Sequence, residues 1–340
     1  MQATRVIAHR GASGWAPEHT ETAVRLAATL GADAVEPDLV ATRDGVLVVR
    51  HDNELSGTTD IADRPELADR RRTQTIDGEE LTGWFVEDLT WAEVATLRAR
   101  ERVPELRPLG ARRDGLDRVL RFTELLAIAD ATELDVVAEL KHATHHASIG
   151  LPLDAMLADA VAGTHWSSSG RLTVESFEES ALHAVRASGV EARLVYLMDE
   201  HGTAADLETA DGASAATYAE QRTDAALAQL ARRVDAISVA KSVLFDRRSG
   251  ELAGSDLVER ADAAGLGTIA WTLRPENRFL EPEHRLGEHE AAWGDWTTEW
   301  GMLAALGLEA VFVDHPDLWR RLATDPPATR SRHADVSGGS

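Results

Sequence analysis

The residues best suited to chemistry are two carboxylates one residue apart, Glu36 and Asp38. Small and β-branched residues surround them and predict a strand, in which side chains two apart project from the same face. Two adjacent anions raise each other's pKa and cost free energy unless a cation lies between them, and a hard divalent metal ion is the usual solution. A lone Glu-x-Asp is more often a solvated strand end. The metal-site prediction therefore depends on which other residues reach the same place.

Charged and polar residues follow most of the other predicted strands. Strand one runs into His9 and Arg10, the short return strand after strand two runs into His51, and strand three ends in Glu139 and Lys141. The later strands end in Glu175 (strand four), Lys241 (strand six), Trp271 (strand seven) and Asp314 (strand eight). Lys141 and Lys241 are the only lysines of the chain, and both come just after a predicted strand, where a compact ammonium differs from a guanidinium in reach and shape.

These residues predict a site for a phosphodiester. If Glu36, Asp38 and Glu139 hold a divalent ion beside Arg10 and Lys141, the site carries one net positive charge, whereas without the ion it would repel an anion. All-oxygen ligation favours Ca²⁺ or Mg²⁺, and the sequence does not distinguish them. His9 and His51 would flank the phosphorus as acid and base, because imidazole titrates near neutral pH.

The elements that must position these residues alternate between strand and helix. Eight strand–helix units predict a single α/β domain, a closed (β/α)8 TIM barrel whose chemistry lies at the C-terminal ends of its strands. The expected strands are Arg5 to Ala8, Ala34 to Val40, Asp135 to Leu140, Leu172 to Glu175, Ala192 to Tyr196, Ala236 to Val239, Thr268 to Thr272 and Ala310 to Val313.

One segment breaks this alternation. Residues from about 53 to 115 are polar and Arg-rich, and they predict an insertion after strand two without a core of its own. The clearest helix in the insertion is expected from Trp91 to Arg100, with Thr90 and Glu93 as a capping box. We expect residues 1–324 to form the catalytic domain and residues 325–340 to be a disordered tail.

Composition narrows the range of partners. The net charge of -23 argues against nucleic acid or an anionic membrane as the main partner, so a small-molecule substrate is expected. The absence of cysteine excludes disulfides and thiolate chemistry. The start of the chain has no export signal and no apolar run reaches about 18 residues, which predicts a cytoplasmic location and leaves an exported form open. The oligomeric state is not decided by the sequence.

The motifs resemble the glycerophosphodiester phosphodiesterase family along nearly the whole chain. They are Val6-Ile-Ala-His-Arg-Gly-Ala-Ser-Gly-Trp-Ala-Pro-Glu-His-Thr20, Glu36-Pro37-Asp38, Thr42-Arg-Asp-Gly-Val-Leu-Val-Val-Arg-His-Asp52, Ala138-Glu-Leu-Lys141, Glu175-Ser-Phe-Glu178, Ile269-Ala-Trp-Thr272 and Gly307-Leu-Glu-Ala-Val-Phe-Val-Asp-His-Pro316. Residues 83–108 and 272–277 look most like the bacterial periplasmic type of that family.

The resemblance implies a metal-dependent barrel that hydrolyses glycerophosphodiesters, such as glycerophosphocholine, to glycerol 3-phosphate and an alcohol. It implies that His9 and His51 are the catalytic pair, that Glu36, Asp38 and Glu139 bind the metal ion, and that Arg10 and Lys141 hold the phosphate. We also expect Lys241 and Trp271 to contact substrate. A glycerol hydroxyl is expected to attack phosphorus first, giving a cyclic phosphate that water then opens.

Two residues depart from the family pattern. His19 replaces the usual asparagine of Pro-Glu-Asn-Thr, and Glu175 replaces the usual glutamine of Gln-Ser-Phe. Glu175 adds a charge, either as a fourth metal ligand or as a substrate contact. Both departures affect the choice of headgroup more than the reaction.

Three other functions fit parts of the pattern. A phospholipase C or sphingomyelinase D type lyase has a similar barrel and histidine pair, but acts on membranes and releases a cyclic phosphate. A metal-dependent amidohydrolase requires His-x-His at strand one, where this chain has His9-Arg10-Gly11. A non-catalytic phosphate-binding barrel would use Arg10 and Lys141 without needing two histidines.

Overall fold

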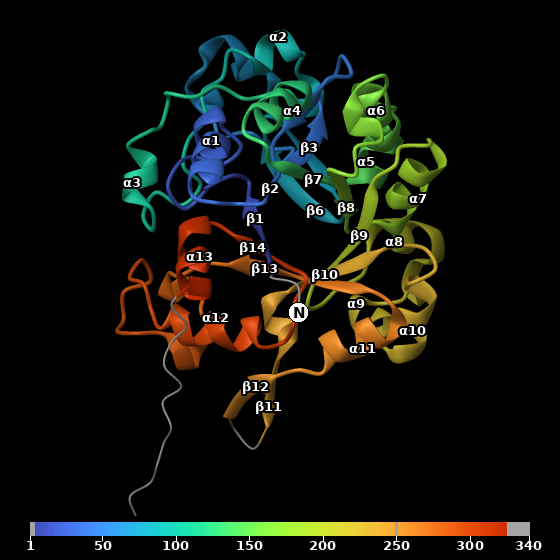
Figure 1. The fold of residues 1–340 in the computed structure, drawn as a ribbon. Helices are drawn as coiled ribbons and strands as arrows, with labels where there is room; N and C mark the ends of the chain where they lie inside the picture. Colours follow the sequence, from blue (N-terminus) through green and yellow to red (C-terminus); the bar gives the residue numbers. More distant parts are fainter. Residues whose placement is uncertain (1–3, 249–250, 325–340) are drawn as a thin grey trace, which may run out of the picture.

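Eight parallel strands close into a barrel at the centre of the molecule (Figure 1). A computed structural model describes residues 4–248 and 251–324, so the predicted disordered tail lies outside the described residues. Each strand pairs with its neighbours in parallel, and β2 pairs with both β1 and β7, which closes the ring. The predicted (β/α)8 TIM barrel is confirmed.

The strands of the barrel lie close to the predicted ranges. They are β1 (Arg5–His9), β2 (Ala34–Glu36) with its continuation β3 (Asp38–Ala41), β7 (Asp135–Leu140), β8 (Leu172–Ser176), β9 (Arg193–Met198), β10 (Ala236–Ala240), β13 (Gly267–Leu273) and β14 (Ala310–Val313). The antiparallel return strand is β4 (Leu47–Val49), which pairs with β3.

Helices surround the barrel and pack their apolar faces on it. They are α1 (Glu21–Thr29), α4 (Phe122–Ala131), α5 (Ala143–Ser148), α6 (Leu153–Val161), α7 (Glu179–Ala187), α8 (Ala205–Asp211), α9 (Tyr218–Gln221), α10 (Asp224–Leu230), α11 (Leu257–Ala264), α12 (Trp296–Ala304) and α13 (Pro316–Thr324). A hairpin, β11 (Phe245–Arg248) and β12 (Glu251–Gly254), follows β10. None of the helices in the described part of the chain has the length and apolarity needed to cross a membrane.

Two apolar layers hold the barrel together. The large outer layer lies between strands and helices, and the smaller inner layer fills the barrel with residues such as Ile7, Val137, Val195 and Phe312. Trp300 on α12 is fully buried in the outer layer. This packing fixes the strands and leaves their C-terminal ends free to carry polar residues.

Two secondary-structure predictions are corrected by the structure. The strand expected from Ala34 to Val40 is divided at Pro37, which has no N–H to donate to a neighbouring strand. The helix expected from Trp91 to Arg100 ends at Val94 in α2 (Trp91–Val94), because the backbone at Arg98 hydrogen-bonds to Asp60 instead.

The insertion has a core, contrary to the sequence prediction. One buried apolar cluster joins the insertion to the barrel. It contains Val40 of β3 and Val48 of β4 together with Leu55, Ile61, Leu67, Val86 and Leu89. The other elements of the insertion are the hairpin β5 (Arg72–Ile76) and β6 (Glu79–Gly83), the short helix α3 (Pro108–Ala111) and 3-10 turns at Ile61–Asp63, Pro65–Arg70 and Val86–Asp88. The apolar residues that form this core are widely spaced along the chain, so no local periodicity indicates it.

Candidate active site

A cavity of about 540 Å³ lies at the C-terminal ends of the parallel strands. Nine of the ten predicted site residues line it: His9, Arg10, Glu36, His51, Glu139, Lys141, Glu175, Lys241 and Trp271. The tenth, Asp38, is 1% exposed and lies behind the cavity wall, in contact with Arg10 and His19. The barrel therefore gathers at one place residues that are spread over more than two hundred positions of sequence.

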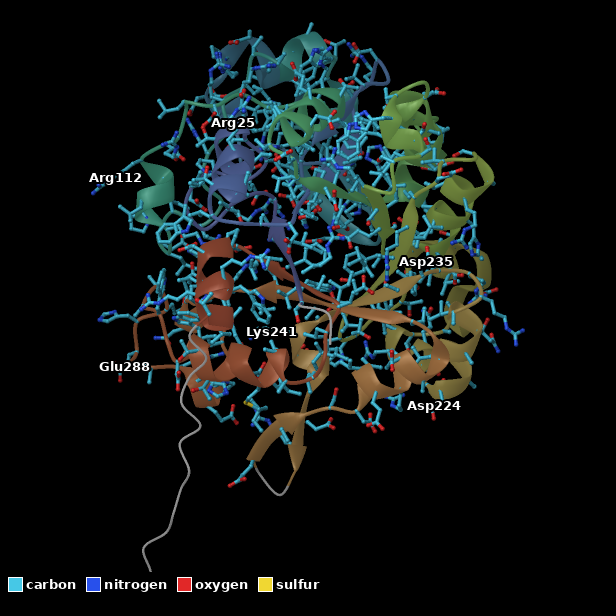
Figure 2. The ribbon with its side chains drawn as sticks, in the orientation of Figure 1. Arg25, Arg112, Asp224, Asp235, Lys241 and Glu288 are labelled. Atoms are coloured by element: carbon cyan, nitrogen blue, oxygen red, sulfur yellow. The ribbon has the colours of Figure 1, made fainter. Side chains whose placement is uncertain are left out.

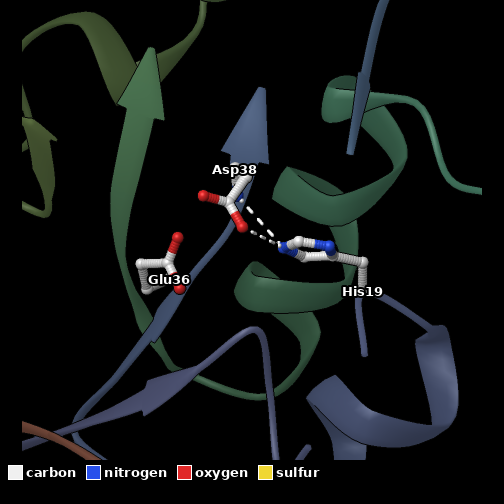
Figure 3. A group of neighbouring side chains, drawn as sticks. All are labelled: His19, Glu36 and Asp38. Carbon is white, nitrogen blue, oxygen red and sulfur yellow. Dashed lines mark hydrogen bonds and ion pairs between the residues drawn. The ribbon is translucent and has the colours of Figure 1, made fainter. Parts of the chain in front are cut away.

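Glu36 and three other carboxylates form two overlapping groups. One oxygen from each of Glu36, Glu139 and Glu175 lies within 4.8 Å of the others, and Glu36 forms a second such group with Asp38 and His19. Figure 3 shows the Glu36 and Asp38 carboxylates on the same side of the chain, with the His19 ring against Asp38. Glu36 is thus common to both groups, while Asp38 and Glu139 approach it from neighbouring strands that pair at these positions.

The pKa values of these carboxylates are shifted in opposite directions. Burial, Asp38 and Glu175 raise the pKa of Glu36 well above its ordinary value, and burial raises the pKa of Glu139 to about 8 despite Lys141 nearby. Burial opposes ionisation of Asp38 too, but Arg10 at 3.0 Å and other donors hold its pKa well below the usual range. Asp38 is compensated by its cationic partners, whereas the effect of burial on the pKa outweighs that of Lys141 at Glu139 and that of Arg10 at Glu36.

This donor set fits a hard divalent ion. Oε1 of Glu36 and Oε2 of Glu175 are buried without a hydrogen-bond partner among the described residues, and Oε1 of Glu139 is in an ion pair with Lys141. Ca²⁺ and Mg²⁺ take carboxylate oxygens as ligands, and such an ion would remove the repulsion between the carboxylates. The cluster is therefore the place where a metal ion of this kind would bind.

His9 is held by a carboxylate that two arginines also contact. Its Nδ1 lies 2.7 Å from Oδ1 of Asp314, and Oδ2 of Asp314 accepts from Arg107 at 2.6 Å and from Arg274 at 2.7 Å. Burial, and then Arg10, lower the pKa of His9 to about 4. The ring is thus fixed in orientation and its other nitrogen, Nε2, is available for chemistry.

His51, like His9, has its Nδ1 beside an aspartate. Its Nδ1 lies 2.5 Å from Oδ1 of Asp52, and its Nε2 lies 3.2 Å from Nζ of Lys141. Burial, Arg10 and Lys141 lower the pKa of His51 to about 3. Because the lysine ammonium only donates, Nε2 is the unprotonated nitrogen of His51, and Nδ1 donates to Asp52.

Arg10 and Lys141 bring positive charge between the histidines and the carboxylates. Arg10 adopts the left-handed backbone conformation, with φ of 59°, and its amide donates to the Glu36 side chain at 3.0 Å. Such a conformation costs free energy for a residue with a side chain, and it aims Arg10 at the cluster. Lys141 contacts Oε1 of Glu139 at 2.8 Å and lies 5.5 Å from the centre of the Phe177 ring.

The two remaining predicted contacts, Lys241 and Trp271, also line the cavity. Lys241 is buried and pairs with Glu299 of α12, so its charge is compensated within the protein. In Figure 2, Lys241 lies in the interior of the molecule, whereas the exposed Arg112 and Glu288 lie at its edge. Nε1 of Trp271 is buried without a hydrogen-bond partner among the described residues, which leaves a donor for a ligand.

Several site residues were not assigned a role from sequence. Asp52 and Asp314 orient the histidines, and both lie within the motifs quoted from the sequence. Arg102 and Arg107 come from the insertion: Arg102 pairs with Glu18 and Asp52, and Arg107 pairs with Glu276 and Asp314. No spacing rule could have found these two, because the insertion reaches the site only through its own fold.

A family model and a curated relative both point to one family of phosphodiesterases. The family model described as "Glycerophosphoryl diester phosphodiesterase family" matches residues 9–318. The glycerophosphodiester phosphodiesterase GDPD6 of Arabidopsis thaliana is 30% identical over 290 residues, covering 81% of this chain and 75% of that protein.

Solved structures of two bacterial proteins share the fold. A putative glycerophosphoryl diester phosphodiesterase from Silicibacter pomeroyi has a TM-score of 0.65 and 22% identity, covering 95% of this chain and 94% of that one. A phosphodiesterase from Oleispira antarctica, in complex with the product sn-glycerol-3-phosphate, has a TM-score of 0.64 and 21% identity, covering 95% and 97%.

Proposed function

The chain belongs to the glycerophosphoryl diester phosphodiesterase family and is an enzyme of that class, and we propose that its histidine pair and carboxylate cluster hydrolyse glycerophosphodiesters with the help of a divalent ion. The observation that carries the proposal is the cavity that brings His9, His51 and three carboxylates to the same strand ends. Glycerophosphocholine is the representative substrate, with glycerol 3-phosphate and the free alcohol as products. The Oleispira antarctica phosphodiesterase, which has the same fold, was solved with the product sn-glycerol-3-phosphate, and this supports glycerol 3-phosphate as a product.

The metal ion is proposed to be Ca²⁺ or Mg²⁺, held by Glu36, Asp38 and Glu139. When bound, it would neutralise the carboxylates and polarise a phosphoryl oxygen of the substrate. Arg10 and Lys141 would hold the other phosphoryl oxygens, since both lie next to the cluster and line the cavity. Trp271 and Lys241 would contact the substrate further along the cavity.

The first chemical step would divide the work between the histidines. A glycerol hydroxyl attacks phosphorus and gives its proton to Nε2 of His51, which the Lys141 contact identifies as unprotonated. The bond from phosphorus to the alcohol oxygen breaks, and Nε2 of His9 donates a proton to that oxygen. The negative charge of the bound phosphodiester offsets Arg10 and so favours the protonated form of His9.

The second step would reverse these roles. Water attacks the cyclic phosphate and gives its proton to His9, while His51 returns its proton to the glycerol oxygen that leaves. Both histidines then regain their starting protonation states. Asp314 and Asp52 keep the two rings oriented throughout.

We also propose that residues 1–324 act as one catalytic domain. The insertion supplies Arg102 and Arg107, which contact the carboxylates that orient the two histidines. A barrel without the insertion would leave Asp314 and Asp52 with fewer cationic partners.

An assay of glycerol 3-phosphate release from glycerophosphocholine tests the proposed function. We expect release with added Ca²⁺ or Mg²⁺, its loss with a chelator and its recovery on adding the ion back. His51→Ala should lower the rate by about 10²- to 10⁴-fold, the usual contribution of a positioned acid or base. A lack of release across several headgroups with either ion would contradict the proposal, and a cyclic phosphate as the final product would indicate a lyase.

A further inference from the structure

Glu175 lies where a metal ligand would have to be. It is at the end of β8, beside β7, and its position in the sheet pairs with Glu139. The side chain is 2% exposed, and Oε2 has no hydrogen-bond partner among the described residues. Glu175 also lines the cavity, so this buried oxygen is aimed at the site and not into the apolar core.

The position of Glu175 differs from that of Asp38 in one decisive respect. Asp38 already has Arg10 at 3.0 Å and His19 at 3.2 Å as partners for one of its oxygens. Glu175 faces Glu36 and Glu139, with one oxygen of each carboxylate within 4.8 Å of the other two. Three carboxylates from β2, β7 and β8 thus converge on one point, and a hard divalent ion takes several such oxygens.

We propose that Glu175 is a ligand of the divalent ion and that its charge removes the net positive charge of the loaded site. The inference rests on the proposed function and concerns the charge of the same site. Four carboxylates then balance the ion, Arg10 and Lys141, so the loaded site is neutral. With glutamine at position 175, the same site would carry one net positive charge.

The charge of Glu175 has opposite effects on the affinity of the site for the metal ion and for phosphate. An additional anionic oxygen strengthens the binding of a cation, because ligand charge sets the affinity of such sites. The same charge weakens the binding of a phosphate anion, most of all the dianionic phosphate monoester that the reaction produces. Glu175 would therefore hold the metal ion more tightly and release glycerol 3-phosphate more easily.

The test measures both affinities in Glu175→Gln by calorimetric titration. We expect the Kd for Ca²⁺ or Mn²⁺ to rise on the order of 10- to 100-fold when one of the carboxylate ligands is lost. We expect the Kd for glycerol 3-phosphate, measured with the metal ion at saturation, to fall by about tenfold. The matched control is Glu178→Gln, three residues on, whose buried carboxylate accepts from Thr144 and belongs to neither cluster. It should change neither Kd by more than about twofold.

A second variant separates ligation from charge. Glu175→Asp keeps the charge but withdraws the carboxylate, so metal affinity should fall while the affinity for glycerol 3-phosphate stays within about twofold of the wild type. Thermal unfolding of each variant verifies that it is folded. Unchanged metal affinity in both variants would overturn the proposal, as would weaker glycerol 3-phosphate binding in Glu175→Gln, which would identify Glu175 as a substrate contact. Either result would leave the hydrolysis assay of the wild-type protein unaffected.

Discussion

The two walls of the cavity differ in how far the protein itself compensates their buried carboxylates. On the wall beside β14, Asp314 contacts His9, Arg107 and Arg274, and these partners hold its pKa well below the usual range although burial opposes this. On the wall formed by β2, β7 and β8, burial and neighbouring carboxylates raise the pKa of Glu36 and Glu175 well above theirs. On the first wall the protein itself compensates the buried carboxylate, whereas on the second wall the effects of burial and of neighbouring carboxylates on the pKa outweigh those of Arg10 and Lys141.

This difference assigns the two walls different tasks. The compensated wall orients His9, because a carboxylate with three partners has little freedom to move. We propose that the second wall binds a metal ion and, through it, a phosphate. Changes in the second wall should therefore affect metal binding, and changes in the first should affect catalysis with the metal still bound.

The largest effect is expected from Glu36→Gln, which alters the carboxylate shared by both clusters. Activity should fall about 10³-fold or more, since the metal ion and the charge stabilisation it supplies are lost together. Calorimetry should show weaker metal binding in this variant. Glu281→Gln, which changes a carboxylate that lines the cavity but belongs to neither cluster, is the control and should bind the metal ion normally. Normal metal binding by Glu36→Gln would show that the cluster is not the metal site.

A smaller effect is expected from Asp314→Asn on the compensated wall. The rate should fall about 10²-fold, because an amide orients His9 less strictly than a carboxylate and leaves Arg107 and Arg274 without their shared partner. Metal affinity should stay the same, which distinguishes this wall from the other. Asp317→Asn, on the following helix and bonded to Trp15, serves as the control. Loss of metal binding in Asp314→Asn would mean that the two walls are not independent.

Much of this comparison could be predicted from the sequence, but not all of it. Strand alternation predicted the barrel, and the barrel topology brought His9, Glu36, Glu139 and Glu175 to one end. The sequence could not predict that Asp38 would contact Arg10 and His19. These contacts depend on the interruption of the strand at Pro37 and on side-chain conformation.

The insertion shows the same limit more clearly. Its polar composition predicted an insertion without a core of its own, yet Val86 and Leu89 join a buried core and Arg107 contacts Asp314, 207 positions away. Contacts over such separations follow from tertiary structure, and local patterns carry no signal for them.

The smallest effect is expected on the pH dependence of stability, through His9. Its pKa is lowered from 6.5 to about 4 in the folded protein, so the neutral ring stabilises the fold fully above pH 6.5 and this contribution is lost as the pH falls toward 4. Chemical unfolding of metal-free wild type and His9→Gln should therefore differ by a pH-dependent amount. Across this range the wild type should lose up to about 3 kcal/mol more than the variant. A difference that does not vary with pH would contradict the burial of a neutral His9.

The most direct test of the central claim is the affinity for glycerol 3-phosphate with and without the metal ion, measured by calorimetry on the wild-type protein at one fixed pH. The account predicts that glycerol 3-phosphate binds at least about tenfold more tightly to the protein saturated with Ca²⁺ or Mg²⁺ than to the chelator-treated protein, since the ion cancels the charge of the carboxylate wall. Equal affinity in the two states would contradict it, because the phosphate would then be held by Arg10 and Lys141 alone.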